Sequence, residues 1–177
     1  MQKLKTRKLN RFKNYNYSTN GYYFVTICSN DRQDIFGNFT NNVGAPLACA
    51  RIELSKIGQI INNQWNDIPN QYDNVEIIEY VIMPNHIHGI IKLGATARVA
   101  PTGLGKIIGT FKSKCSTKYL RYIKNNDIGT SADIWQRNYY DHVIRTDSSL
   151  KQICEYIRTN LFTWSTDTKN PENNKST

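Results

Sequence analysis

The chain has 177 residues, enough for one domain with a hydrophobic core and too few for two comfortable domains. Its 23 Lys and Arg against 14 Asp and Glu give a formal net charge of +9, which favours a polyanion such as nucleic acid over a membrane surface as partner. The sequence has no apolar run near the roughly 20 residues that cross a bilayer and no apolar secretory segment at its start, so we expect a cytoplasmic protein without membrane contact.

A basic arm is predicted over residues 1–20. Six Lys or Arg side chains fall within its first thirteen residues, among them Lys3, Lys5 and Arg7. So dense a run of like charge packs poorly against a core but suits a phosphate backbone. A solvated terminus without a partner explains the same run equally well.

The main domain is predicted over residues 21–164. GYYFVTICS (21–29) is rich in aromatic and β-branched residues and predicts a first strand. The loop after it can hold a hairpin. Apolar residues then recur every three or four positions from Leu54 to Trp65, which predicts an amphipathic helix ending before IPNQ.

Two further strands are predicted next, VEIIEYVI and HIHGIIKL, which together form a β-hairpin over residues 75–93. Pro84 and Asn85 between them suit a tight turn. The apolar spacing from Leu104 to about Lys124 predicts a second helix. The opposite side of this helix carries Lys114 and other basic residues, either as a solvated face or as a DNA contact.

The last elements are a strand in WQRNYYDHVIR (135–145) and a helix in DSSLKQICEYIRTNLFTW (147–164), with an Asp or Ser cap. The polar tail, residues 165–177, is expected to be disordered. This order predicts an α+β fold: a ferredoxin-like βαββαβ sheet with helices on one face and an additional C-terminal helix.

The four cysteines, Cys28, Cys49, Cys115 and Cys154, are widely scattered and form no Cys-x-x-Cys pair. Neither a zinc knuckle nor a disulfide framework is indicated. We expect reduced, partly buried thiols.

Two of the three histidines, His86 and His88, stand one residue apart in a predicted strand. Side chains alternate across a strand, so both project from one face with Ile90, and the intervening apolar row meets the packed helices. At this spacing their nitrogens can converge on one metal ion or one phosphate. A structural hydrogen-bonding role is the alternative, and His-x-His alone is too short to name a reaction.

The predicted last helix can supply further site residues. Tyr156 and Asn160 lie side by side at the edge of its apolar stripe. If this helix covers the histidine face, the Asn160 amide oxygen can complete a three-ligand metal site, with the Tyr156 hydroxyl one turn away. On spacing alone, a boundary aromatic and a helix-ending or solvent-side asparagine are the favoured interpretation.

Four segments, YVIMPNHIHGII, FKSK, WQRNYYDHVIR and YIRTN, together resemble the REP-associated tyrosine transposases, a branch of the IS200-like single-tyrosine HUH transposases. The resemblance runs from RKLNRFKNYNYSTNGYYFVTIC to TNLFTW. It implies a metal-dependent endonuclease and strand transferase (a transposase) that acts on single-stranded DNA containing hairpins, often REP-like palindromes, through a 5′-phosphotyrosine.

In that family the HUH histidines match His86 and His88, the nucleophile matches Tyr156, and a polar metal ligand matches Asn160. One departure is Asn160-Leu161, where this branch commonly has Asn-Pro, so the helix end is expected to differ. Imidazole ligands favour zinc or another transition metal, whereas the family implies Mg²⁺ or Mn²⁺. We expect Mn²⁺ to be the ion most compatible with both.

Weaker roles fall to other side chains. Tyr140 is the second candidate nucleophile, and His142 could contact a phosphate or transfer a proton, although a structural hydrogen bond is the simpler role. Further phosphate contacts are expected from Lys112, Lys114, Arg137 and Arg145.

Two other functions fit parts of the sequence. One is a DNA-binding module without catalysis, suggested by the basic arm. The other is a metallohydrolase without a covalent intermediate, although no carboxylate base is evident near the histidines. A prokaryotic, nucleoid-associated monomer or homodimer is expected. The sequence leaves open which hairpin is recognised, and whether the protein moves its own element or serves the host.

Overall fold

The computed structural model of the chain describes residues 19–40, 51–94 and 102–164. One antiparallel sheet has the strand order β4-β5-β1-β6. Its strands are β1 (Gly21–Cys28), β4 (Val75–Ile82), β5 (His86–Leu93) and β6 (Tyr140–Ile144). Two short strands, β2 (Gly37–Thr40) and β3 (Arg51–Leu54), form a separate antiparallel pair. Lys3, Lys5, Arg7, Cys49 and the predicted tail lie outside the described residues.

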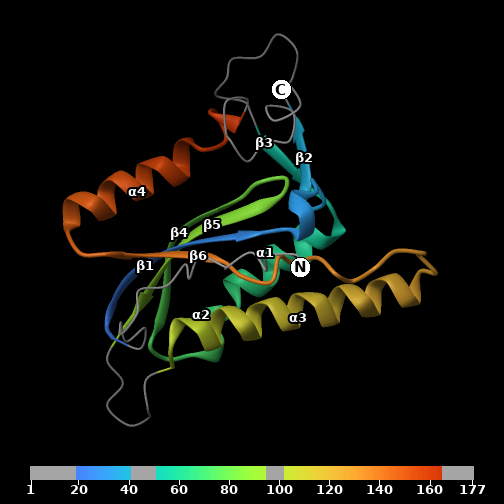
Figure 1. Ribbon diagram of the computed structural model, residues 1–177, viewed down its shortest axis with the longest axis horizontal. Coiled ribbons are helices and arrows are strands. Elements are labelled where there is room, and N and C mark those ends of the chain that lie inside the picture. Colours follow the sequence, from blue (N-terminus) through green and yellow to red (C-terminus); the bar gives the residue numbers. More distant parts are fainter. Residues whose placement is uncertain (1–18, 41–50, 95–101, 165–177) are drawn as a thin grey trace, which may run out of the picture.

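Helices cover both faces of the four-stranded sheet (Figure 1). One face carries α1 (Lys56–Asn66), the single turn α2 (Ile68–Gln71) and α3 (Leu104–Asn125), and the other carries α4 (Asp147–Thr159). Element order and strand order confirm the ferredoxin-like α+β fold with an additional C-terminal helix. Among the described helices, none is long and apolar enough to cross a membrane.

Alternation along β5 divides its side chains between two hydrophobic clusters, as predicted. Ile87 and Ile91 belong to the larger cluster, which includes residues of α1 and α3. Ile90 faces the other way and packs with Ile157 of α4. Gly89 lies against Trp65, and a Cβ on it would lie only 2.3 Å from Trp65 Cζ2. The strand that carries the histidines is therefore held on its far side by a close backbone-to-indole contact.

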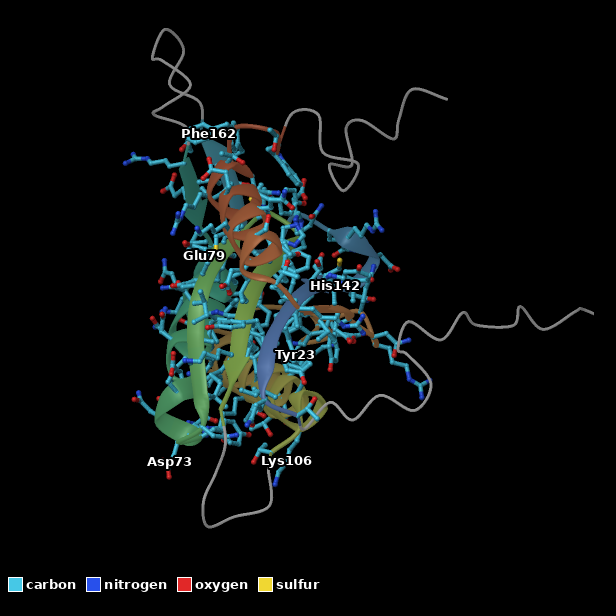
Figure 2. The ribbon with its side chains drawn as sticks, turned by 90° about the vertical axis from the view of Figure 1, so that its left-hand side faces the viewer. Tyr23, Asp73, Glu79, Lys106, His142 and Phe162 are labelled. Atoms are coloured by element: carbon cyan, nitrogen blue, oxygen red, sulfur yellow. The ribbon has the colours of Figure 1, made fainter. Side chains whose placement is uncertain are left out.

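The C-terminal helix lies across the sheet face near β4 and β5 (Figure 2). Of its residues only Ile157 is buried, while Leu150, Ile153 and Cys154 pack partly buried against the same small cluster. Arg158 adds an ion pair to Glu79 of β4, with 2.7 Å between Nε and Oε2. An exposed pair of this kind contributes at most about 1 kcal/mol. The apolar contact therefore sets most of the position of α4.

Several element boundaries differ from the sequence predictions. The first helix begins at Lys56, because Ser55 caps it by accepting from the Gly58 amide, and Leu54 ends a strand. IPNQ forms a helical turn with proline near its start. The predicted Asp or Ser cap of the last helix is wrong, since the Thr146 hydroxyl accepts from the Ser149 amide.

The strand predicted over residues 135–145 is also too long. Regular pairing with β1 covers only Tyr140–Ile144, and Trp135 forms a single isolated bridge with Ser29. The indole Nε1 of Trp135 instead donates to the Lys112 carbonyl of α3. A tertiary contact therefore overrides the strand propensity of this segment.

Candidate active site

His86 and His88 lie side by side on the sheet face that α4 covers. Their side chains are 0% and 1% exposed, and their Nε2 atoms are 3.1 Å apart. An imidazole nitrogen binds a metal at about 2.0–2.1 Å, so two nitrogens that share an ion lie within about 4.2 Å of each other. The pair satisfies that condition.

Each histidine has a polar partner on its other ring nitrogen. The Asn85 Oδ1 lies 2.8 Å from His86 Nδ1, and the Asn85 amide nitrogen donates to the Arg32 carbonyl. Because this bond turns the Asn85 oxygen toward His86, the proton of His86 sits on Nδ1 and its Nε2 carries a lone pair. Thr26 Oγ1 lies 2.9 Å from His88 Nδ1. When Thr26 accepts from that nitrogen, the lone pairs of His86 Nε2 and His88 Nε2 face each other. A cation between the two nitrogens would stabilise this arrangement.

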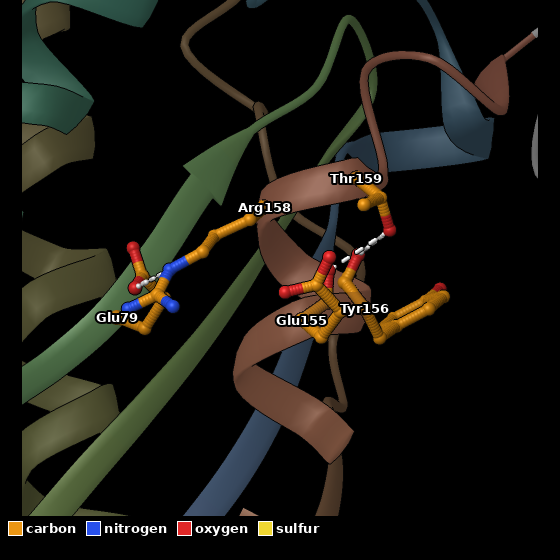
Figure 3. A network of polar contacts seen from close by, with 5 residues as sticks. All are labelled: Glu79, Glu155, Tyr156, Arg158 and Thr159. Atoms are coloured by element: carbon orange, nitrogen blue, oxygen red, sulfur yellow. Dashed lines mark hydrogen bonds and ion pairs between the residues drawn. The ribbon is translucent and has the colours of Figure 1, made fainter. Parts of the chain in front are cut away.

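Tyr156 reaches the histidine pair from α4. Its hydroxyl lies 3.1 Å from His88 Nε2, and the ring remains 41% exposed. Figure 3 shows Tyr156 projecting from the opposite side of α4 to Arg158, whose guanidinium pairs with Glu79. The helix is therefore attached to β4 on one side and presents a solvent-accessible phenol beside the histidines on the other.

Asn160 ends α4, one turn beyond Tyr156. Its backbone angles are helical, which the following Leu161 permits. It is 1% exposed, and within the part of the chain that the structure describes neither atom of its amide has a hydrogen-bond partner. The ring of Trp164, four residues further on, lies 5.9 Å from that of His86. A buried amide oxygen without a partner is costly unless it binds a ligand such as a cation.

These side chains fit a divalent cation. Across the described residues, no cluster of three or more His, Cys, Asp or Glu could hold one. The Asn160 amide oxygen could serve as a third protein ligand, since Asn160 is buried in the segment between Tyr156 and Trp164, each of which contacts the histidine pair. A mixed nitrogen and oxygen set suits Mn²⁺ or Mg²⁺ as well as softer metals.

The other predicted site residues lie beside the cavity near Tyr156, in a separate hollow near the start of α4, or on α3. Tyr140 and His142 lie on the same face of the edge strand β6, and Tyr140 lines the cavity beside Tyr156. Arg137 is exposed between two cavity-lining residues. His142 and Arg145 line a separate small hollow near the start of α4.

Lys112 and Lys114 lie on α3, across the sheet from the histidines (Figure 1). The Lys112 ammonium donates to the carbonyls of Gln136 and Arg137, and burial lowers its pKa. The structure thus gives Lys112 a role in holding the segment that lines the cavity. Lys114 lines a groove between α1 and α3 with no connection to the histidine face.

Three residues beside the histidines were not anticipated as site residues. Thr26 and Phe24 come from β1, where Thr26 is the register partner of His88, and the Phe24 ring stacks on His88 at 5.3 Å. The sequence predicts Asn85 only as a turn residue. Its position directly before His86 is a usable signal, whereas Thr26 and Phe24 become visible only once the pairing of β1 with β5 is known.

Comparison with known proteins agrees with these observations. The family model described as "Transposase IS200 like" matches residues 50–160, a span that includes both histidines, Tyr156 and Asn160. An uncharacterized protein of Haemophilus influenzae is 36% identical over 178 residues, which cover 91% of each chain. A solved structure of a REP-associated tyrosine transposase bound to a REP hairpin aligns with 86% of this chain and 72% of its own, with a TM-score of 0.56 and 17% identity. The chain belongs to the IS200-like transposase family.

Proposed function

We propose that this transposase is a metal-dependent endonuclease and strand transferase for single-stranded DNA, with Tyr156 as its nucleophile. The observation that carries the proposal is the 3.1 Å contact between the Tyr156 hydroxyl and His88 Nε2, at a buried histidine pair. A phenol in that position can approach a phosphate held at the pair while its ring remains accessible to DNA.

His86, His88 and Asn160 would hold a divalent cation, Mn²⁺ or Mg²⁺. When bound, such an ion makes a phosphate more electrophilic and stabilises the negative charge that builds on its oxygens. Asn85 supports this role because it directs the His86 proton to Nδ1, and Thr26 does the same for His88 when its hydroxyl accepts from Nδ1. This leaves both Nε2 atoms available as ligands.

The Tyr156 oxygen would attack the scissile phosphorus and form a new phosphorus–oxygen bond. The bond from phosphorus to the 3′-oxygen breaks, the phenol loses one proton, and the released 3′-oxygen gains one. The product is a 5′-phosphotyrosine and a free 3′-hydroxyl. Because the phosphodiester energy is conserved, a 3′-hydroxyl from another strand can reverse the step and join DNA.

DNA carrying REP-like hairpins is the substrate class that we propose. The structural relative is bound to a REP hairpin, and a net charge of +9 suits any nucleic acid. Lys3, Lys5, Arg7, Arg137 and Arg145 remain candidate phosphate contacts, whereas the Lys112 ammonium donates to backbone carbonyls and Lys114 lines the groove between α1 and α3. The histidines and Tyr156 meet within one chain, which is compatible with a monomer and does not require a homodimer that exchanges the tyrosine helix. The site of action would be the nucleoid in the cytoplasm of a prokaryote.

The test is incubation with labelled single-stranded hairpin oligonucleotides from the DNA flanking the gene, with Mn²⁺ or Mg²⁺, followed by denaturing electrophoresis. A covalent adduct that requires metal, disappears in Tyr156→Phe and persists in the matched control Tyr140→Phe would support the proposal. Cut product without adduct in Tyr156→Phe would indicate a metallohydrolase. Retarded but uncut DNA would indicate a binding module.

A further inference from the structure

A cavity of about 390 Å³ adjoins the Tyr156 hydroxyl on the side of β6. His88 and Tyr156 line one end of it, so whatever fills the cavity lies next to the proposed reaction centre. Its volume falls within the roughly 300–1,000 Å³ that is typical of small-molecule sites. The proposed metal ligands and nucleophile do not account for the rest of its lining.

Aromatic side chains form one wall of the cavity. Tyr140 lines the cavity and is 49% exposed, although it is a large aromatic residue. Phe24 meets its ring edge-on at 6.4 Å and also stacks on His88 at 5.3 Å. Phe24 thereby links the Tyr140 ring to the histidine pair. A half-exposed aromatic ring beside a site for single-stranded DNA is suited to stacking against a base.

Two amide side chains, Gln136 and Asn138, line the cavity as well. Each carries donors and an acceptor, the groups that pair with the edge of a nucleobase. The backbone of Gln136 is held in place, because its N–H donates to the Cys28 carbonyl and its carbonyl accepts from the Lys112 ammonium. The amides are therefore presented from a fixed segment, although it contains no regular secondary structure.

We propose that this cavity binds one unpaired nucleobase next to the cleaved phosphate, stacked on Tyr140 with its edge toward Gln136 and Asn138. The inference rests on the proposed function and specifies its substrate. A base within a duplex is stacked on both faces and has its pairing edge occupied, so the cavity selects single-stranded DNA at the cleavage position. Tyr140 thus serves in substrate binding and not as a second nucleophile.

The experiment measures binding and cleavage separately. Affinity is measured by fluorescence anisotropy with the hairpin oligonucleotides above, intact or with a single abasic site at each position around the cleaved phosphate. The proteins are the wild type, Tyr140→Ala, Tyr140→Phe and the control Leu120→Ala, whose exposed side chain lies on α3. The wild type and Tyr140→Ala are measured a second time in versions that also carry the substitution Tyr156→Phe, which prevents covalent trapping.

At one position, the abasic site should weaken wild-type binding roughly 5- to 150-fold, the effect of losing one stacked base. Tyr140→Ala should show a similar loss on intact DNA and little further loss on that abasic DNA. Tyr140→Phe and Leu120→Ala should bind like the wild type. Equal binding of intact DNA by Tyr140→Ala and the wild type would overturn the inference. So would an abasic site that, at every position, weakens binding by Tyr140→Ala as much as it weakens binding by the wild type.

Adduct formation by the wild type distinguishes this inference from the proposed function. An adduct on intact DNA together with no effect of Tyr140→Ala or of any abasic site would refute the base site alone. The base effect without any adduct would support the base site and refute the proposed covalent chemistry.

Discussion

Replacing Thr26 with valine removes one hydroxyl beside His88 and leaves the side-chain volume nearly unchanged. Thr26 is 6% exposed, and its Oγ1 lies 2.9 Å from His88 Nδ1. The substitution therefore leaves a buried ring nitrogen without its partner, a loss of about 1–3 kcal/mol. When the Thr26 hydroxyl accepts from Nδ1, it keeps the His88 proton on that nitrogen, so without the hydroxyl a proton on Nε2 can compete with the metal. We expect the affinity for Mn²⁺ to fall roughly 10- to 100-fold.

The assay is a Mn²⁺ titration followed by electron paramagnetic resonance, with thermal unfolding recorded in parallel without metal. Thr26→Ser retains the hydroxyl and should bind Mn²⁺ like the wild type. Thr40→Val is the matched control, since its hydroxyl donates to the Arg51 carbonyl in the exposed hairpin. Wild-type affinity in Thr26→Val would refute the role assigned to Thr26, and an equal loss in Thr40→Val would show that the effect is not specific to the site.

Three further predictions concern single side chains. Gly89→Ala places a methyl group 2.3 Å from Trp65 Cζ2, so denaturant titration should show a free energy of unfolding lowered by about 1–3 kcal/mol; unchanged stability would show that Trp65 is free to move. Asn160→Leu removes a buried amide that lacks partners among the described residues, so calorimetry should show at least about tenfold weaker Mn²⁺ binding, with little loss of stability; the reverse result would make Asn160 structural. Burial raises the pKa of the Cys115 thiol to about 12, so the thiol remains almost entirely protonated at pH 8. Iodoacetamide should therefore label Cys115 in urea but not in the folded protein. Equal labelling under both conditions, measured by peptide mass spectrometry, would contradict this prediction.

Local patterns were sufficient for most elements of the fold. The bounds of β4 and β5 agree with the predicted hairpin, and the spacing of apolar residues located α1 and α3 to within two residues. These features depend on neighbours a few positions away, which is the range that periodicity reports.

Errors occurred where a distant residue determines local structure. Trp135 reads as part of a strand, yet its indole bonds to α3 and regular pairing begins only at Tyr140. The last helix is capped by Thr146, whose hydroxyl accepts from the Ser149 amide; Thr, Asp and Ser are all favoured caps, so propensity does not choose among neighbouring candidates.

The sequence by itself determined that His86 and His88 share one face of a strand and that Tyr156 and Asn160 share one side of a helix, because both relations follow from the repeat of a single element. Only the tertiary structure decided that α4 crosses the histidine face and that β1 brings Thr26 and Phe24 beside His88. Strand order and helix placement result from burying apolar surface between segments far apart in the chain. Their contacts therefore have no signature in the spacing of adjacent residues.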